Sequence, residues 1–348
     1  MIIFFVIIVL LSIYKCRFAG KEYFTKDYCS IDETRSINGI FILLILISHT
    51  YAKGSTIGVL DEIYEPIRTF LGQFVVVPFM FFSGYGIMES IKKKETYIKT
   101  FPRRRVLPLY IRFAVISLIY VPISLIMSPG ISVTRYLLSF TGLTSIGNGG
   151  WYIFAIFMMY LFVIVAFNIF KNRHFLAVCS VLAMTVVLTV VEVLLDFPTY
   201  YYSTMLFFPI GMLFSLYKEY FDKFVTRSNA YWAICMIISI AGFAMVKVFL
   251  VDKSVVFYPV WCIFGMATIL LLGLKVKLNN KIINWAGKNI FMIFMLQGIP
   301  QILLIKLAEI NNILYYVAVI IATVLLTLLA EIIQKKIEAI KTKNVVDK

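Results

Sequence analysis

Apolar segments long enough to enter a membrane recur along the whole chain, and they constrain the fold more than any other feature. A bilayer core is about 30 Å thick, so a helix needs roughly 20 apolar residues to cross it. The sequence therefore predicts an all-α fold, a polytopic membrane helix bundle with ten core transmembrane helices and a short N-terminal helix. The segments cover residues 2–14, 37–52, 69–89, 106–127, 151–170, 175–195, 201–217, 231–251, 255–273, 289–308 and 312–334.

The segment at 2–14 is shorter than a membrane crossing usually requires. No positive residue precedes it and no small-residue cleavage pattern follows it, so it is a poor signal peptide. We expect an extra helix or an interfacial anchor there. The predicted organisation is a short N-terminal helix and basic linker over residues 1–30, a membrane domain over 31–334 and a basic cytoplasmic tail over 335–348.

The positive charges predict the orientation of the bundle. Of 33 Lys and Arg residues, 26 fall in alternate connections and the C-terminal tail, whereas the intervening connections hold 4. Because cytoplasmic loops of membrane proteins are enriched in Lys and Arg, the first set and the C-terminus are predicted to be cytoplasmic. The net charge of +15 is thereby explained by topology and membrane lipids, and we expect no nucleic-acid partner.

Cysteine and histidine are too few and too scattered for a metal centre. The five cysteines show no paired spacing, and the chain has only two histidines. Neither a metal site nor a disulfide framework is predicted.

His49 is the most informative polar residue, because it stands near the predicted outer end of the 37–52 segment. Ionisable groups inside membrane spans are costly and are functional candidates by default. An imidazole can act as a general base near pH 7; the alternative is an interfacial histidine bonded to a neighbouring helix. Glu192 lies at a similar depth and could orient the imidazole, or its carboxylate could snorkel to the outer surface.

The densest basic stretch ends in three arginines, Arg103, Arg104 and Arg105, which Pro102 and Pro108 bracket. Arginine forks at a helix start, beside free backbone N–H groups, can form a phosphate site. The same charges can fix topology by binding anionic lipid head groups. Arg112, about one turn into the next helix, could hold an anion or snorkel back to the surface.

Two glycine-containing motifs have both packing and binding interpretations. In "FFSGYGI" the glycines permit close helix packing, and Ser83 can form a hydrogen bond across helices. In "GNGGWYI" a flexible connection precedes Trp151 and Tyr152. These aromatic residues can belong to an interfacial belt, or they can stack against a sugar or an acyl chain.

Taken in order, these motifs resemble the integral-membrane acyltransferase 3 family over about residues 32 to 334. The matching stretches are "NGIFILLILISH", "FFSGYGI", "RRRVLPLY", "GGWYI" and "WAGKNIFMIFMLQ". Asn38 stands where the family usually has Arg or Lys, and Arg35 is a substitute from the preceding turn. Gln297 replaces the family's late histidine, Asn289 replaces its serine, and Pro102 occupies the place of an arginine three residues before Arg105.

The resemblance implies a bacterial cell-membrane enzyme that O-acylates an envelope polysaccharide or glycolipid. It implies acetyl-CoA or another acyl-CoA as donor, with its phosphates at the four arginines and its pantetheine arm beside Ser83 and Tyr85. His49 would be catalytic, oriented by Glu192. The candidate acceptor-binding residues are Arg35, Asn38, Trp151, Tyr152 and Gln297. The alternatives are a transporter without chemistry and a partner subunit of a polysaccharide-synthesis or export complex with the same fold.

Overall fold

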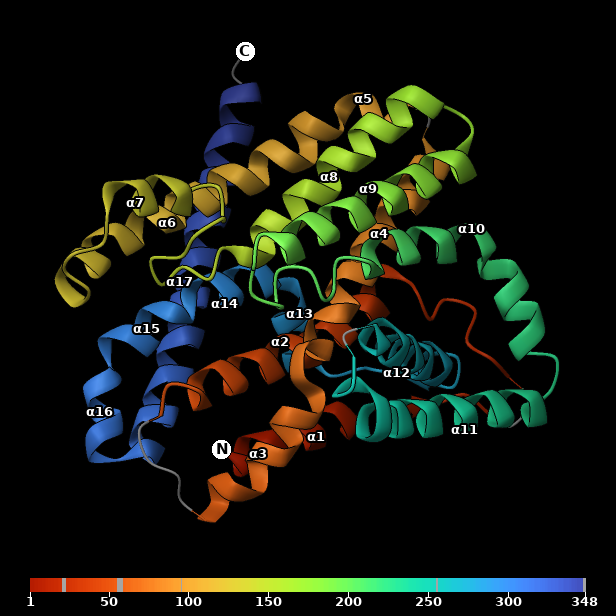
Figure 1. Cartoon of the computed structure of the whole chain (residues 1–348), viewed down its shortest axis with the longest axis horizontal. Coiled ribbons are helices and arrows are strands. Elements are labelled where there is room, and N and C mark those ends of the chain that lie inside the picture. Colours follow the sequence, from red (N-terminus) through yellow and green to blue (C-terminus); the bar gives the residue numbers. More distant parts are fainter. Residues whose placement is uncertain (21–22, 55–58, 95, 255, 347–348) are drawn as a thin grey trace.

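The computed structural model describes residues 1–20, 23–54, 59–94, 96–254 and 256–346, and it is almost entirely helical (Figure 1). Within these residues, six helical stretches are long and apolar enough to cross a membrane, so the chain is a multi-pass membrane protein. The prediction of an all-α bundle is confirmed at this level, whereas ten crossings remain a prediction. The six stretches are Asp61–Lys93, Tyr97–Met127, Trp151–Phe170, His174–Leu194, Asn229–Val251 and Asn312–Ile337.

In the first half of the chain, helices follow the predicted segments closely. The predicted 151–170 segment coincides with α8, and the 106–127 segment with α6, which continues from α5 through a π-helical turn. Two helices that the sequence did not predict lie in connections between these segments: α3 between α2 and α4, and α7 between α6 and α8. The elements are α1 (Ile2–Ile13), β1 (Arg17–Phe18), α2 (Ile31–Tyr51), α3 (Val59–Leu71), η1 (Gly72–Val76), α4 (Val77–Lys93), α5 (Tyr97–Phe101), η2 (Pro102–Val106), α6 (Leu107–Met127), α7 (Val133–Ser139), α8 (Trp151–Phe170) and α9 (His174–Leu194).

The second half contains two differences from prediction that change how its helices pack. One is a late start of α10, and the other is a broken helix between α13 and α17. The elements are α10 (Phe207–Val225), α11 (Asn229–Val246), η3 (Lys247–Val251), α12 (Phe257–Gly273), β2 (Val276–Lys277), α13 (Lys281–Lys288), α14 (Ile290–Leu296), α15 (Gly298–Leu303), α16 (Ile305–Ile310) and α17 (Asn312–Val346).

α2 begins six residues before its apolar run because its first turn is well capped. The Ser30 side chain accepts a hydrogen bond from the backbone N–H of Glu33, and Asp32 and Glu33 lie in the first turn. Both features stabilise a helix N-terminus. The charged first turn therefore extends the helix to 21 residues, about 31 Å at 1.5 Å per residue.

The predicted segment 201–217 was placed too early. Residues 199–206 form turns instead, and α10 begins at Phe207. The hydroxyl of Tyr201 donates to the carbonyls of Gly142 and Leu143, 3.4 and 3.0 Å away. These bonds hold the turns against the connection between α7 and α8, a contact that hydropathy does not record.

The predicted single helix over 289–308 is divided into α14, α15 and α16. Pro300 has no backbone N–H, so a regular ladder cannot continue through it. Hydroxyl groups from neighbouring helices bond carbonyls near the break: Tyr120 donates to Met295 at 2.6 Å, and Tyr315 donates to Gln301 at 3.2 Å. Broken helices persist in lipid when neighbouring groups satisfy the freed backbone in this way.

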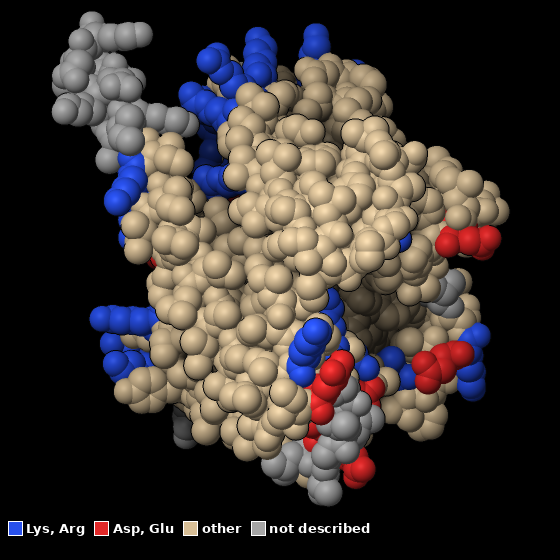
Figure 2. All heavy atoms as spheres, turned by 90° about the vertical axis from the view of Figure 1, so that its left-hand side faces the viewer, with Lys and Arg blue, Asp and Glu red and all other residues tan. Residues whose placement is uncertain are grey.

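Connections predicted to be cytoplasmic gather on one side of the bundle. Strand β1 pairs antiparallel with β2, with Arg17 opposite Lys277, and so joins two of these basic connections. In Figure 1 the α8–α9 and α10–α11 connections lie at the right, whereas α7 and α16 lie at the left. Seen from that left-hand side, much of the surface is uncharged, and Lys and Arg stand out along the upper edge and in further groups at the left and lower right (Figure 2). We call the side that carries these connections the basic side.

Two helix pairs approach each other through glycines. A Cβ on Gly84 of α4 would lie 1.9 Å from the carbonyl oxygen of Phe208, and a Cβ on Gly211 of α10 would lie 2.0 Å from that of Phe81. Gly39 of α2 and Gly287 of α13 form the same reciprocal arrangement. α2 and α4, which line the candidate site, are thus each fixed by backbone contact to a second helix.

Candidate functional site

His49 is half-buried near the end of α2 and lines a cavity of about 420 Å³, which we call the outer cavity. Four segments meet there: the end of α2, the connection before α8, the first turn of α8, and the break between α14 and α15. The other lining residues are Ala52, Lys53, Ser145, Gly147, Asn148, Gly149, Trp151, Phe294, Gln297, Gly298 and Gln301.

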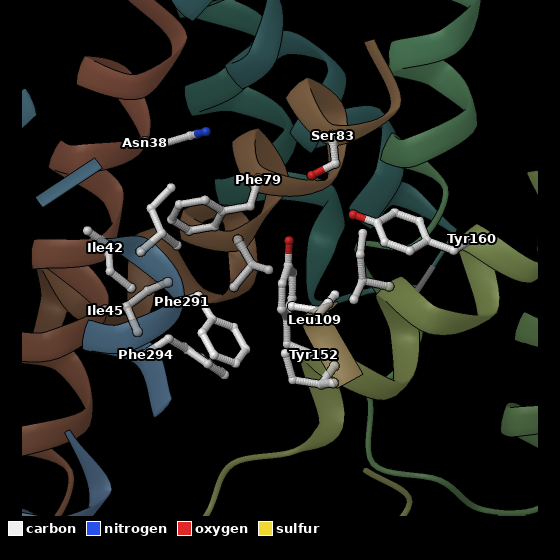
Figure 3. A pocket seen from close by; sticks show the side chains of 14 residues that line it. Asn38, Ile42, Ile45, Phe79, Ser83, Leu109, Tyr152, Tyr160, Phe291 and Phe294 are labelled. Carbon is white, nitrogen blue, oxygen red and sulfur yellow. The ribbon is translucent and has the colours of Figure 1, made fainter. Parts of the chain in front are cut away.

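A second cavity of about 180 Å³ lies between α2, α4, α6, α8 and α14, and we call it the central cavity. Its lining is mostly apolar. Figure 3 shows the hydroxyl groups of Ser83, Tyr152 and Tyr160 directed towards one another at its edge, and the Ser83 hydroxyl bonds to that of Tyr152. The lining residues are Asn38, Ile42, Ile45, Val76, Phe79, Ser83, Leu109, Tyr152, Ile153, Ile156, Tyr160, Ile290, Phe291 and Phe294.

A third and larger cavity of about 910 Å³ opens on the basic side and includes Ser30, Thr34, Tyr85, Gly86 and Lys92. We call it the inner cavity. Tyr85 faces this cavity rather than the central one, because it is two residues from Ser83 and points to a different side of α4. Burial raises the pKa of Cys29, which also lines the inner cavity, to about 12. Its thiol therefore stays protonated and is not a nucleophile there.

One face of α2 contributes to all three cavities. The residues concerned are three or four positions apart, the spacing of neighbours on a single helix face. From the basic side to the other end of the helix they are Ser30, Thr34, Asn38, Ile42, Ile45 and His49. The cavities are therefore arranged in sequence along one helix, and His49 stands at the end farthest from the basic side.

Two polar atoms that line the cavities lack a partner among the described residues. The Oδ1 atom of Asn38 in the central cavity is buried and accepts no hydrogen bond. In the outer cavity the amide of Gln297 donates to the carbonyl of Phe294 at 3.1 Å, but its Oε1 atom is buried and unpaired. Buried polar atoms are rarely left without a partner, so each cavity offers an acceptor to a donor group of a ligand.

Arg103, Arg104 and Arg105 are exposed on the π-helical turn η2, on the basic side. Arg105 is close enough to Tyr160 of the central cavity to act on it electrostatically. Arg112, two turns further along the helix, is also exposed and lines a separate cavity of about 200 Å³ beside Phe291. Phe291 lines the central cavity too. Positive charge therefore lies close to the central cavity in two places.

Glu192 is not paired with His49 in this structure. The charged groups that act on His49 are Lys53 and Arg68, both cationic. Glu192 instead lies near Tyr201, and both its carboxylate oxygens are buried without a partner among the described residues. Glu192 and His49 were matched by depth in the membrane, but depth does not imply contact: α9 packs against α8 and α10, whereas α2 packs against α13, α14 and α4.

The remaining predicted site residues, apart from Arg35, fall into two groups. Trp151 lines the outer cavity with His49 and Gln297, while Tyr152 lines the central cavity with Asn38 and Ser83. Arg35 lies outside both, and its guanidinium pairs with Asp32 at 3.0 Å.

Sequence reasoning missed Lys53, Tyr160 and Phe294, all of which line a cavity. Only Lys53 carried a usable signal, since it follows His49 by one helical turn. Its ammonium group is the cation nearest in sequence to the imidazole and can stabilise negative charge that develops beside it.

Comparison with known proteins gives one significant result. A family model described as an acyltransferase domain matches residues 36–332. That match includes every cavity-lining residue of the central and outer cavities. No curated protein and no solved structure shows a significant match to the chain.

Proposed function

This chain belongs to the acyltransferase 3 family, and from that membership we propose that it moves an acyl group from cytoplasmic acyl-CoA to a hydroxyl group on the outer side of a bacterial cell membrane. The observation that carries the proposal is the row of three cavities along one face of α2, with His49 at its end. A thioester and a hydroxyl on opposite sides of a membrane need a path of this kind to meet.

The donor enters from the basic side, which is the cytoplasmic side. Its phosphates bind at Arg103, Arg104, Arg105 and Arg112, because one guanidinium group can donate two parallel hydrogen bonds to the oxygens of a phosphate. Its pantetheine arm lies in the central cavity, where the unpaired Oδ1 of Asn38 accepts a hydrogen bond from an amide N–H of the arm. The apolar lining suits the methylene groups of the arm and a short acyl chain such as acetyl.

The acceptor occupies the outer cavity. Trp151 offers an aromatic face for stacking, and the unpaired Oε1 of Gln297 accepts a hydrogen bond from a hydroxyl group. The side chains of Asn148 and Gln301 add further polar groups to the lining. This combination suits a sugar of an envelope polysaccharide or glycolipid, in which hydroxyl groups alternate with apolar ring faces.

His49 is the centre of the transfer. The acceptor oxygen attacks the thioester carbonyl carbon, a C–O bond forms, the C–S bond breaks, and the hydroxyl proton passes through His49 to the departing thiolate. In the alternative route the imidazole first takes the acyl group and then yields it to the acceptor. Lys53, which lines the same cavity, stabilises the oxyanion in either route.

The proposal is tested by release of coenzyme A from acetyl-CoA, with purified protein in nanodiscs and crude cell-envelope glycan as acceptor. We expect release that depends on the acceptor, together with radiolabel from the acetyl group on the glycan. Absence of both, with acetyl-CoA binding also undetectable, would instead favour a transporter or a partner subunit of an export complex. The broken helix α14–α16 is a feature that transporters share.

Replacing Arg105 by glutamine is expected to raise the KM for acetyl-CoA about tenfold and to leave the KM for the acceptor within about twofold. The reason is that Arg105 lies close enough to Tyr160 of the central cavity to act on it electrostatically, and in the proposed mode it binds a donor phosphate. A charge-assisted hydrogen bond contributes about 1.5–3 kcal/mol. Steady-state kinetics with each substrate varied in turn measure both constants.

Lys99→Gln is the matched control, because Lys99 is an exposed cation on the neighbouring helix α5. Like Arg105→Gln, this substitution removes one exposed positive charge, but Lys99 does not line the central cavity. Equal changes in both KM values for Arg105→Gln, or the same donor effect in Lys99→Gln, would show that the arginine acts only through topology or lipid binding.

A further inference from the structure

Phe294 is the single residue, among those described, that lines both the central and the outer cavity. Its ring centre lies 6.3 Å from that of His49 on one side and 5.8 Å from that of Tyr152 on the other. Trp151 packs edge-on against the same ring at 6.5 Å. The phenyl ring therefore stands between the cavity that suits the donor and the imidazole.

The backbone at Phe294 is placed where ligand binding in the outer cavity can affect it. α14 has seven residues and ends at Leu296, and the break follows at Gln297, directly before α15 begins at Gly298. The carbonyl of Phe294 accepts a hydrogen bond from the amide of Gln297, whose other amide atom is the unpaired acceptor in the outer cavity. A ligand bound by Gln297 is therefore one hydrogen bond away from the backbone of Phe294.

We propose that Phe294 is a partition residue that keeps water in the outer cavity from the thioester until an acceptor binds. The proposal rests on the acyl-transfer function given above. With the ring in place, the thioester reaches His49 only when acceptor at Gln297 draws the ring aside. Without the ring, water takes the acceptor's place: its oxygen bonds to the acyl carbon, the C–S bond breaks, and acetate and coenzyme A are released.

The experiment measures acceptor-free hydrolysis of acetyl-CoA by purified protein in nanodiscs, as coenzyme A thiol and free acetate. We expect Phe294→Ala to raise this hydrolysis at least tenfold over the unmodified chain and to lower acceptor-dependent transfer. Hydrolysis should disappear in the double variant Phe294→Ala/His49→Ala, because His49 activates the attacking water. Phe294→Leu, which keeps most of the apolar volume, is expected to give an intermediate rate and serves if the alanine variant does not fold.

Met295→Ala is the matched control. Met295 is the next residue of α14, is fully buried and lines neither cavity, so its truncation removes similar packing without opening the partition. We expect its acceptor-free hydrolysis to equal that of the unmodified chain. Raised hydrolysis in Met295→Ala would overturn the proposal, because loosened packing would then explain the effect.

The proposal is also overturned if acceptor-dependent release occurs in the unmodified chain while folded Phe294→Ala and Phe294→Leu hydrolyse acetyl-CoA no faster. In that outcome the proposed acyl-transfer function is retained, and only the proposed role of Phe294 is rejected. If neither the unmodified chain nor any variant releases coenzyme A, with or without envelope glycan, the acyl-transfer function and the role of Phe294 are both rejected.

Discussion

Replacing His49 by alanine is expected to lower acyl transfer by about 10²- to 10⁴-fold, the contribution typical of a general acid–base residue. His49 is the residue at which the row of cavities ends, and it lines the outer cavity beside Trp151 and Gln297. No carboxylate acts on it among the described groups, whose charges near the imidazole are those of Lys53 and Arg68. The residual rate should come from proximity of the two substrates alone.

The measurement is acetyl transfer to envelope glycan by the variant, with correct folding checked by size-exclusion chromatography and by retained acetyl-CoA affinity. His174→Ala is the matched control, since it removes the other histidine, which begins α9 on the basic side. Its rate should stay within about twofold of the unmodified chain. A well-folded His49→Ala protein with normal transfer would rule out the proposed role of the imidazole.

Gly84→Ala is expected to destabilise the protein by about 3 kcal/mol, at the upper end of the range for overpacking a tight core. A Cβ at this position would lie 1.9 Å from the carbonyl oxygen of Phe208 and 2.8 Å from its carbonyl carbon. Both atoms belong to the backbone of α10, so no side chain can rotate away. The helices must move apart and lose the packing around Gly211 as well.

Gly86→Ala provides the control two residues further along α4. Nothing lies within 4 Å of a Cβ built on Gly86, and alanine is preferred over glycine within a helix by up to about 1 kcal/mol. Thermal unfolding in detergent should therefore show a lower Tm for Gly84→Ala and an equal or higher Tm for Gly86→Ala. Equal Tm values for the two variants would contradict the close approach of α4 and α10.

Hydropathy and charge predicted the features that depend only on how deep a segment lies in the membrane. The segment 151–170 coincides with α8, and the basic connections before α2 and after α12, which the charge bias assigns to one side, meet in the β1–β2 pair. His49 was recognisable because an ionisable side chain in an apolar run is rare. Each of these inferences depends only on position along the membrane normal.

Inferences that depend on position around the bundle could not be made in the same way. Glu192 was matched to His49 by depth, yet it lies near Tyr201. Phe294 is one of 31 phenylalanines, and nothing in its sequence neighbourhood distinguishes a residue between two cavities from one that faces lipid. The break after Leu296 follows from Pro300, but the hydroxyl groups that make it tolerable come from other helices, Tyr120 from α6 and Tyr315 from α17.

The second of these tyrosines also affects when the candidate site can be completed during synthesis. Tyr120 is made before the broken helix, but Tyr315 belongs to α17, which follows it. Until α17 inserts, the carbonyl of Gln301 lacks the hydroxyl that bonds it in the finished protein, and an unpaired carbonyl in hydrocarbon is costly. The part of the outer cavity that Gln301 lines is therefore stabilised only once α17 has inserted, so a chain arrested before α17 would have His49 in place without the finished surface that we propose receives the acceptor.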